Sequence, residues 1–365
     1  MAIAAAGVFV LAISAATGAG AAPGPADGDQ QQQLAEIITR GSSNPAAHAI
    51  AGASSGLSGG TSTDTVGFGP SQTAFLSAMN YGALHPDVAP PGADDWKCRP
   101  GAAHPEPVVL VHGTWENAYE NFAYVSQPIR DAGYCVFTFN YGRSTPDQGG
   151  GVGAILPGTY GTGYIQDSSK QLARFTDRVL AATGAHKVNI VAHSQGGPMS
   201  RWYMKFDGGA PKVDHLMTFG ATNHGTTLDG IGSLGRAVQN FGIDTLGPSE
   251  IYVGHAAAQQ TVGSDFLEQL NAGGDTVPGV QYTVVGSRYD EVSTPYDSTF
   301  LRPGPGARVD NITLQDGCGQ DMSDHLTLMY SPRVLSIILH TLAPGRSPNL
   351  TCAFNPWLVG GSGKP

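Results

Sequence analysis

A serine between an apolar run and a helix-like stretch is the residue of this 365-residue chain best placed for nucleophilic chemistry. Ser194 lies in "NIVAHSQGGPMSRW", with the small residues Ala192 and Gly196 two positions away on either side. A serine exposed on a sharp strand-to-helix turn needs small residues there, because larger side chains would collide where strand and helix cross. This G-x-S-x-G pattern, with alanine in the first glycine position, predicts that Ser194 is a nucleophile and not an ordinary turn serine.

The hydroxyl of a serine is a weak nucleophile near neutral pH and needs a base, which in turn needs a carboxylate to orient it. In proteins with this kind of turn, the acid and the histidine follow the serine along the chain. Asp290 comes directly after a strand-like run, and His325 lies in a loop before the last helix-like stretch. We therefore predict that Asp290 is the acid and His325 the base.

Other residues compete for these two roles. His193 is adjacent to the serine and should point away from it, His224 comes too early along the chain, and His340 lies inside a predicted helix. Asp324, beside His325, is expected to be a loop or cap residue. The remaining candidates for the acid are Glu291, Asp297, Asp310 and Asp316.

The negatively charged oxygen of a tetrahedral intermediate needs preorganised N–H donors. One donor is expected to be the backbone N–H of Gln195, which follows the nucleophile. The other is expected from the loop after the apolar run "PVVLVHG", where Thr114 follows Gly113. Gly113 lets the backbone turn close to the nucleophile, and the Thr114 hydroxyl could add a further donor. An ordinary glycine turn is the alternative interpretation of this loop.

The elements that must position these residues alternate along the chain from Cys98 onward. Strand-like runs lie at residues 107–113, 134–142, 187–194, 212–221, 282–292 and 307–315. Helix-like stretches lie at residues 120–133, 164–184, 196–206 and 331–342. This alternation predicts an α/β fold with a mostly parallel sheet and helices on both faces. An insertion at about 224–275 contains no convincing strand and is expected to form a helical cap over the site.

Composition and charge exclude several classes of protein. The 41% of hydrophobic residues are enough for a sizeable core. The formal net charge is −10, and the 19 Lys and Arg residues are scattered, so binding to nucleic acid is not expected. The cysteines form no CxxC pair, and segments such as "DNITLQD" lack a convincing calcium-loop pattern. We therefore expect no metal ion.

The N-terminal region differs from the rest of the chain in composition. Residues 1–21 form an uncharged apolar run that ends in small residues, which predicts a signal peptide and a secreted protein. A membrane anchor is the alternative, and no other stretch could span a bilayer. Residues 22–71 are expected to be a flexible Gly/Ser-rich arm. Residues 72–365 form the predicted catalytic domain.

Several separated motifs over roughly residues 72–342 resemble those of a known family. They are "VLVHGTWEN", "NIVAHSQGGPMSRW", "KVDHLMTFGATNHGT", "QQTVGSDFLEQLN", "GSRYDEVSTP" and "DHLTLMYSP". Together they resemble the secreted class 2 triacylglycerol lipases of the α/β-hydrolase superfamily and, more distantly, the yeast lipase B type. The resemblance implies an α/β-hydrolase fold and cofactor-free hydrolysis of carboxylic esters. It also implies the same roles for the five site residues: Ser194, Asp290, His325, Thr114 and Gln195.

The four cysteines of an exported chain would form two disulfides, with three possible pairings. Cys98 lies just before one predicted strand and Cys135 opens the next, so neighbouring strands would bring them together. Cys318 precedes the histidine loop, and Cys352 follows the last helix. We predict Cys98–Cys135 and Cys318–Cys352, which is also the pairing that the resemblance implies.

The predicted activity is cleavage of lipid esters through an acyl-serine intermediate by a secreted, monomeric enzyme with a hydrophobic substrate. Residues 149–164 are apolar and uncharged, and with the insertion they could form an acyl-binding wall or be ordinary surface loops. Alternative functions are hydrolysis of short esters or polyesters, extracellular acyl transfer, and a catalytically inactive cell-surface binding protein. Asn311 and Asn349 fit the pattern of glycosylation acceptors.

Overall fold

The computed structural model describes residues 60–227, 230, 254–345 and 349–361. Within these residues, six parallel strands form the central sheet in the order β3–β2–β5–β6–β7–β8. The strands are β2 (Val108–Val111), β3 (Val136–Thr138), β5 (Val188–His193), β6 (Val213–Phe219), β7 (Gln281–Gly286) and β8 (Arg308–Thr313). The order reverses between β2 and β5, and sheets of this kind bind ligands at the carboxyl ends of the strands beside such a reversal.

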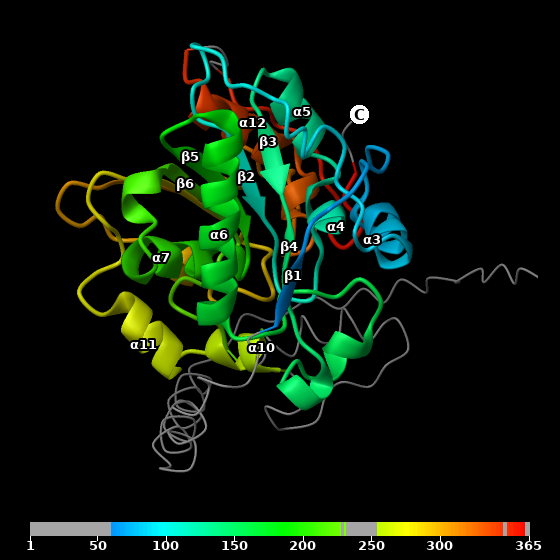
Figure 1. The fold of residues 1–365 in the computed structure, drawn as a ribbon, viewed down its shortest axis with the longest axis vertical. Helices are drawn as coiled ribbons and strands as arrows, with labels where there is room; N and C mark the ends of the chain where they lie inside the picture. Colours follow the sequence, from blue (N-terminus) through cyan, green and yellow to red (C-terminus); the bar gives the residue numbers. More distant parts are fainter. Residues whose placement is uncertain (1–59, 228–229, 231–253, 346–348, 362–365) are drawn as a thin grey trace, which may run out of the picture.

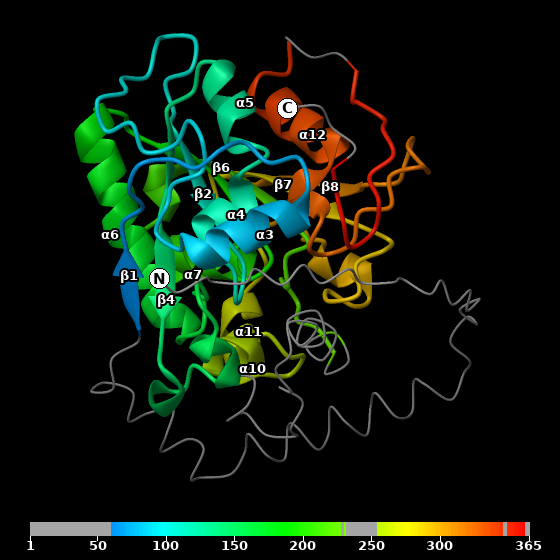
Figure 2. The same cartoon turned by 90° about the vertical axis from the view of Figure 1, so that its right-hand side faces the viewer.

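Helices cover both faces of the sheet, as the sequence predicts (Figure 1). The face on the left of Figure 1 carries α6 (Ile165–Thr183) and α7 (Gly196–Phe206). The opposite face carries the short helices α4 (Ala118–Phe122) and α5 (Ser126–Asp131) together with α12 (Pro332–Leu342). Helix α3 (Phe75–Leu84) lies beside α4 (Figure 2).

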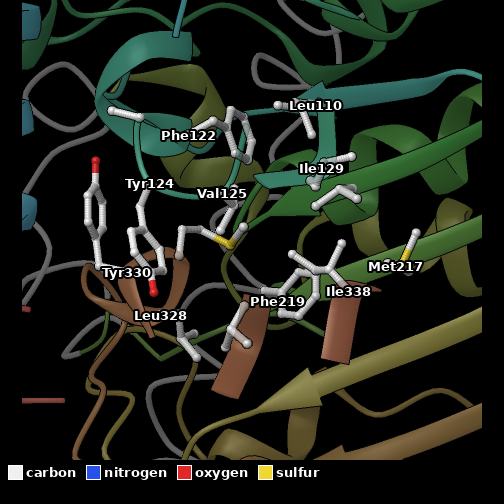
Figure 3. Packing of buried hydrophobic residues seen from close by; sticks show 14 of the residues in the cluster. Leu110, Phe122, Tyr124, Val125, Ile129, Met217, Phe219, Leu328, Tyr330 and Ile338 are labelled. Carbon is white, nitrogen blue, oxygen red and sulfur yellow. The ribbon is translucent and has the colours of Figure 1, made fainter. Parts of the chain in front are cut away.

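Alternate residues of the strands face two separate hydrophobic cores. In β2, Val108 and Leu110 pack into the core shared with α4, α5 and α12, whereas Val109 and Val111 pack into the core shared with α6 and α7. All four side chains are fully buried. Figure 3 shows the first core, where side chains of the α4–α5 segment, the sheet and α12 meet. A sheet buried on both faces explains why its strands are continuous apolar runs.

The single helix predicted over residues 120–133 is wrong, because the structure has two short helices there. Helix α4 ends at Phe122, and α5 begins at Ser126. Pro128 has no backbone N–H, so a continuous helix could not make the bond from residue 128 to residue 124. In the structure Pro128 lies in the first turn of α5, where proline is tolerated.

The strand predicted over residues 134–142 is also divided. Its first half is β3, at the edge of the central sheet, and its second half, β4 (Asn140–Arg143), pairs antiparallel with β1 (Thr61–Thr63). The predicted flexible arm is therefore partly ordered, because its residues 61–63 pair with β4 of the domain. The backbone N–H of Gly69 also donates to the carbonyl of Ala89 at 2.8 Å. The β-branched threonines of β1 favour this extended pairing.

The described part of the predicted cap contains two short helices. It contains α10 (His255–Gln259) and α11 (Asp265–Asn271), and the ring of Phe266 on α11 stacks on Trp202 of α7 at a centroid distance of 5.1 Å. Residues 228–229 and 231–253 of the insertion lie outside the described residues, as does the predicted signal peptide. No helix of the described part of the chain is long and apolar enough to cross a lipid bilayer.

Candidate active site

Ser194 lies on the tight turn between β5 and α7. Its φ angle is +51°, a left-handed value that an ordinary residue rarely adopts and that is typical of a strained functional turn. The backbone here is packed closely, because a Cβ on Gly196 would lie 2.5 Å from the carbonyl oxygen of Val111. The requirement for small residues around Ser194 therefore follows from the contact between α7 and β2.

Three of the predicted residues form a continuous chain of hydrogen bonds. The Nε2 atom of His325 is 2.9 Å from Oγ of Ser194, and its Nδ1 atom is 3.0 Å from both carboxylate oxygens of Asp290. Asp290 follows β7, and His325 lies between β8 and α12. With Ser194 after β5, the three side chains come from separate loops that follow the carboxyl ends of parallel strands. Ser194, Asp290 and His325 are all buried.

The carboxylate of Asp290 is fixed by the backbone that follows it. Its Oδ1 atom accepts hydrogen bonds from the backbone N–H groups of Val292 at 2.9 Å and Ser293 at 2.7 Å. With Oδ1 fixed in this way, both carboxylate oxygens face Nδ1 of His325 at 3.0 Å. Asp290 can therefore hold the ring in one orientation, as the acid in a Ser–His–Asp arrangement must do.

The electrostatic surroundings favour the charged form of His325. Burial lowers the pKa of this imidazole, but the charge and hydrogen bond of Asp290, with the charges of Glu291 and Glu116, outweigh burial and raise the pKa to about 9. Glu291 is itself perturbed, since burial and the charge of Asp324 raise its pKa to about 7. The site thus stabilises an imidazolium, the species that forms when a serine transfers its proton.

The competing acids lie elsewhere. Asp297 and Asp310 are exposed, and Asp316 is exposed and bonded to Arg288 at 2.6 Å. Glu291 accepts a hydrogen bond from the backbone N–H of His325 at 3.4 Å, and among the described residues no hydrogen bond joins its carboxylate to the imidazole ring. Asp324 fits its expected cap role, because its carboxylate accepts bonds from the N–H groups of Thr327 and Leu358 at 2.9 and 2.8 Å.

The competing histidines are bonded to other groups. His224 contacts the carbonyl of Ser298 at 2.8 Å and the carboxylate of Asp275 at 3.1 Å. His340 lies on α12. The ring of His193 contacts Glu116 at 3.0 Å and the backbone carbonyl of His325 at 2.9 Å, and among the described residues no hydrogen bond joins it to Ser194.

Thr114 and Gln195 lie side by side at the nucleophile. In the described part of the chain, no hydrogen bond occupies the backbone N–H of either residue. Their side chains are linked, because the Thr114 hydroxyl donates to Oε1 of Gln195 at 2.5 Å. A third residue completes this group, since Nε2 of Gln260 donates to the Thr114 hydroxyl at 2.8 Å. Gln260 is itself held by the hydroxyl of Thr222, which donates to its Oε1 atom at 2.8 Å.

Sequence reasoning missed two residues next to the site. Gln260 belongs to the quoted motif "QQTVGSDFLEQLN", but its position in the sequence gave no sign of the contact with Thr114, 146 residues away. Glu116 belongs to "VLVHGTWEN" and lies against both Gly113 and His193. The available signal for Glu116 was its charge, because it is the one acidic residue in "VLVHGTWEN".

Both disulfides have the predicted pairing. The Cys98–Cys135 bond joins residues 37 apart in sequence, and the Cys318–Cys352 bond joins residues 34 apart. The second disulfide encloses the loop of His325 together with α12. The described residues contain no group of three or more His, Cys, Asp or Glu side chains placed to hold a metal ion.

The sheet order, the turn at Ser194 and the hydrogen-bonded Ser–His–Asp arrangement define the class of protein: the chain has an α/β-hydrolase fold. Residues 105–300 match the family model described as "Lipase (class 2)". The chain therefore belongs to the class 2 lipase family.

Individual relatives are similar to parts of the chain. A triacylglycerol lipase of Pseudarthrobacter phenanthrenivorans is 31% identical over 131 residues, which are 34% of this chain and 35% of that protein. Lipase B of Pseudozyma antarctica is 27% identical over 188 residues, which are 48% of this chain and 49% of that protein. The chain thus spans a third to a half of the length of these curated relatives.

A solved structure supports the fold. Lipase B of Aspergillus fumigatus has a TM-score of 0.53 with this chain at 19% sequence identity, covering 70% of this chain and 55% of that one. At this identity the likeness concerns the fold alone.

Proposed function

We propose that the protein is a lipase that hydrolyses carboxylic esters of lipids through a covalent acyl-serine. The observation that carries the proposal is the continuous chain of hydrogen bonds from Ser194 through His325 to Asp290, with distances of 2.9 and 3.0 Å. Membership of the class 2 lipase family supports the same activity. The substrate and the roles of the residues are part of the proposal.

In the first half of the reaction, Oγ of Ser194 attacks the carbonyl carbon of the ester while Nε2 of His325 accepts the serine proton. The C–O bond to the alcohol then breaks, and His325 returns the proton to the leaving alcohol. In the second half, water attacks the acyl-serine with His325 again as the base, and the fatty acid is released. Asp290 keeps the proton on Nδ1 and stabilises the imidazolium.

The oxyanion would be bound by the backbone N–H groups of Thr114 and Gln195. Removing one donor of this kind typically costs on the order of 10²–10³ in turnover. The Thr114 hydroxyl is a further candidate, although here it donates to Oε1 of Gln195. In the opposite orientation of the Gln195 amide, Nε2 would donate to Thr114 and free its hydroxyl for the oxyanion. Among the described residues, Nε2 of Gln195 has no hydrogen-bond partner, and in that orientation the Thr114 hydroxyl would become its acceptor.

A hydrophobic acyl chain fits the segment beside the oxyanion loop. Gly153 packs on the ring of Trp115, because a Cβ on this glycine would lie 2.8 Å from the indole nitrogen. The backbone N–H of Trp115 donates to Tyr160 at 2.9 Å, so the segment 149–160 is attached to the loop that carries Thr114. We infer that this segment forms one wall of the acyl-binding site.

Secretion is also part of the proposal. Two disulfides are typical of proteins that fold in an oxidising compartment. The family and the predicted signal peptide agree with an extracellular protein. Asn311 is a poor acceptor for a glycan, because its amide is bonded to the backbone of Leu301 at 2.9 and 3.1 Å.

The test is hydrolysis of an ester series from acetyl to oleoyl, with and without an emulsified interface, by the protein and by Ser194→Ala. We expect the variant to fold, to lose nearly all turnover and to lose labelling by a serine-reactive phosphonate. Preference for long emulsified esters identifies a lipase, and preference for soluble acetyl esters identifies an esterase. A Ser194→Ala protein with wild-type turnover would contradict the proposed nucleophile.

A further inference from the structure

Glu116 and His193 form a second buried acid–histidine pair, directly behind Ser194. The Oε2 atom of Glu116 is 3.0 Å from Nδ1 of His193, and the two side chains are 5% and 0% exposed. His193 is the last residue of β5, and its ring lies 4.9 Å from the ring of His325, measured between centroids. The reaction steps proposed above use neither residue.

The pair contacts three of the segments that carry the candidate site residues: the loop of Thr114, the turn of Ser194 and the loop of His325. Glu116 Oε2 accepts a hydrogen bond from the backbone N–H of Gly113 at 2.9 Å, which fixes the loop that carries Thr114. His193 precedes the nucleophile, and its Nε2 atom is 2.9 Å from the backbone carbonyl oxygen of His325. Gly113, Glu116 and Ser194 are closely packed, because a Cβ on Gly113 would lie 2.4 Å from Glu116 Oε2 and 3.0 Å from Cβ of Ser194.

The hydrogen-bond partners determine the charges of the pair. Nε2 of His193 faces a carbonyl oxygen, which can only accept, so Nε2 carries a hydrogen. Burial raises the pKa of Glu116, but the imidazoles of His193, His325 and His112 outweigh it and lower the pKa, which favours the carboxylate form. The bond that Oε2 accepts from the backbone N–H of Gly113 fits the same form. A carboxylate can only accept, so a carboxylate at Glu116 pairs with a hydrogen on Nδ1 of His193, as in an ion pair of carboxylate and imidazolium.

Asn121 fits the same charges. Its amide lies 2.9 Å from Nδ1 of His193, with Nδ2 as the nearer atom. Among the described residues its Oδ1 atom has no hydrogen-bond partner. With the amide turned over, Oδ1 would accept the N–H on Nδ1 of His193, as an imidazolium requires.

We propose that the Glu116–His193 ion pair positions the catalytic groups, by holding the backbone of His325 on one side and the oxyanion loop on the other. This inference rests on the function proposed above. Through the His325 carbonyl, the pair fixes the position of the His325 imidazole, whose Nε2 atom lies 2.9 Å from Oγ of Ser194. Through Gly113, it fixes the position of the backbone N–H of Thr114. Burying two charges is costly, and apolar residues of similar volume often fill such a space as well or better. Packing alone therefore gives no reason for an ion pair here.

Two substitutions of His193 separate its two contacts. His193→Asn keeps a polar group near the position of Nδ1 but cannot reach the His325 carbonyl. His193→Gln extends an amide N–H toward the position of Nε2. We expect His193→Asn to lower kcat on a soluble nitrophenyl ester on the order of 10–100-fold with little change in KM, since small misplacements of reacting groups have such effects. His193→Gln should recover most of the loss. His215→Asn is the matched control, because His215 is a half-buried histidine on β6 bonded to Thr283.

Glu116→Gln adds a measurement that a merely structural role would not change. The amide introduced by this substitution would still accept the bond from Gly113, but the negative charge of the carboxylate is gone. Glu116 raises the pKa of His325, so its neutralisation should move the acid limb of the pH profile of kcat/KM to lower pH. The charged and titratable groups that face His325 are Asp290, Glu291, Asp324, Glu116 and His193. Those that face Glu116 are His112, Glu120, His193, His325, Tyr141 and Tyr330.

The assay distinguishes a failure of this inference from a failure of the proposed function. If the wild-type protein hydrolyses no ester of the series, the proposed function is wrong, and the positioning role is wrong with it. If the wild type is active and Ser194→Ala is not, the function stands. The positioning role is then overturned if folded His193→Asn and Glu116→Gln proteins keep the wild-type kcat and acid limb. If His193→Asn does not fold, by circular dichroism, the Glu116→Gln protein decides the question by the same two measurements.

Discussion

Replacing Asp290 by asparagine would change which nitrogen of His325 carries the proton. Oδ1 of Asp290 accepts two backbone N–H bonds, at 2.9 and 2.7 Å, so only an oxygen can remain at that position. The amide nitrogen of the introduced side chain must then replace Oδ2, 3.0 Å from Nδ1 of His325. Its N–H would compete for Nδ1 with the remaining oxygen, which is also 3.0 Å from Nδ1, and when the N–H donates to Nδ1 the ring proton moves to Nε2. Nε2 would then point a hydrogen at Ser194 when it should accept one.

The expected loss in turnover is large. The wrong tautomer cannot accept the proton of Ser194 across the 2.9 Å hydrogen bond, and the charge that stabilises the imidazolium is also removed. In another serine hydrolase the equivalent substitution lowers kcat by about 10⁴, and we expect on the order of 10²–10⁴ here. The upper value corresponds to about 5 kcal/mol in the activation free energy. KM should change little, because Asp290 lies behind His325 and has no direct contact with the ester.

The assay is hydrolysis of a soluble nitrophenyl ester by purified variants, with Glu291→Gln as the matched control. Glu291 is adjacent in sequence, but its carboxylate contacts the backbone N–H of His325 and not its ring. We expect Glu291→Gln to lose only a few-fold in kcat, which is small beside the loss at Asp290. The argument is refuted if Asp290→Asn keeps turnover near the wild-type value, or if Glu291→Gln loses as much as Asp290→Asn.

Two further predictions concern pH and the second disulfide. Because the pKa of His325 is raised to about 9 and the base must be neutral to accept a proton, kcat/KM should increase with pH, reach half of its maximum near pH 9 and level off about one pH unit higher. An acid limb with a midpoint below pH 7 would contradict the electrostatics described here. Replacing Cys318 and Cys352 together by serine opens a loop of 34 residues and should lower the free energy of unfolding by about 3–4 kcal/mol in urea titrations. An unchanged urea midpoint would show that this disulfide does not stabilise the fold.

Those parts of the site that depend on local sequence could be predicted. Ser194 stands out because strand, turn and helix follow one another within a few residues. Asp290 and His325 follow from the order of nucleophile, acid and histidine along the chain and from their places after strand-like runs. The parallel sheet follows from the continuous apolar runs of strands such as β5, in which every residue is buried.

The rest depends on contacts between residues far apart in sequence. Glu116 and His193 are 77 residues apart, and Gln260 and Thr114 are 146 residues apart. No periodicity or spacing within a short window contains such information. The pairing of β1 with β4 was missed for the same reason, since a three-residue strand shows too little alternation to be recognised. The break between α4 and α5 was different, because the signal at Pro128 was present in the sequence.

The position of β1 sets a practical limit to shortening or modifying the N-terminal part of the chain. The carbonyl of Gly60 accepts a bond from Gln171 at 3.1 Å, and Asp64 binds Arg178 through both carboxylate oxygens at 2.6 and 2.9 Å, so this segment links β4 to α6. A protein shortened to begin at Gln72 would lose these bonds and leave the outer edge of β4 open to pairing with other chains. An affinity tag or a surface-attachment linker should therefore be joined ahead of Gly60, where it leaves the β1–β4 pair intact.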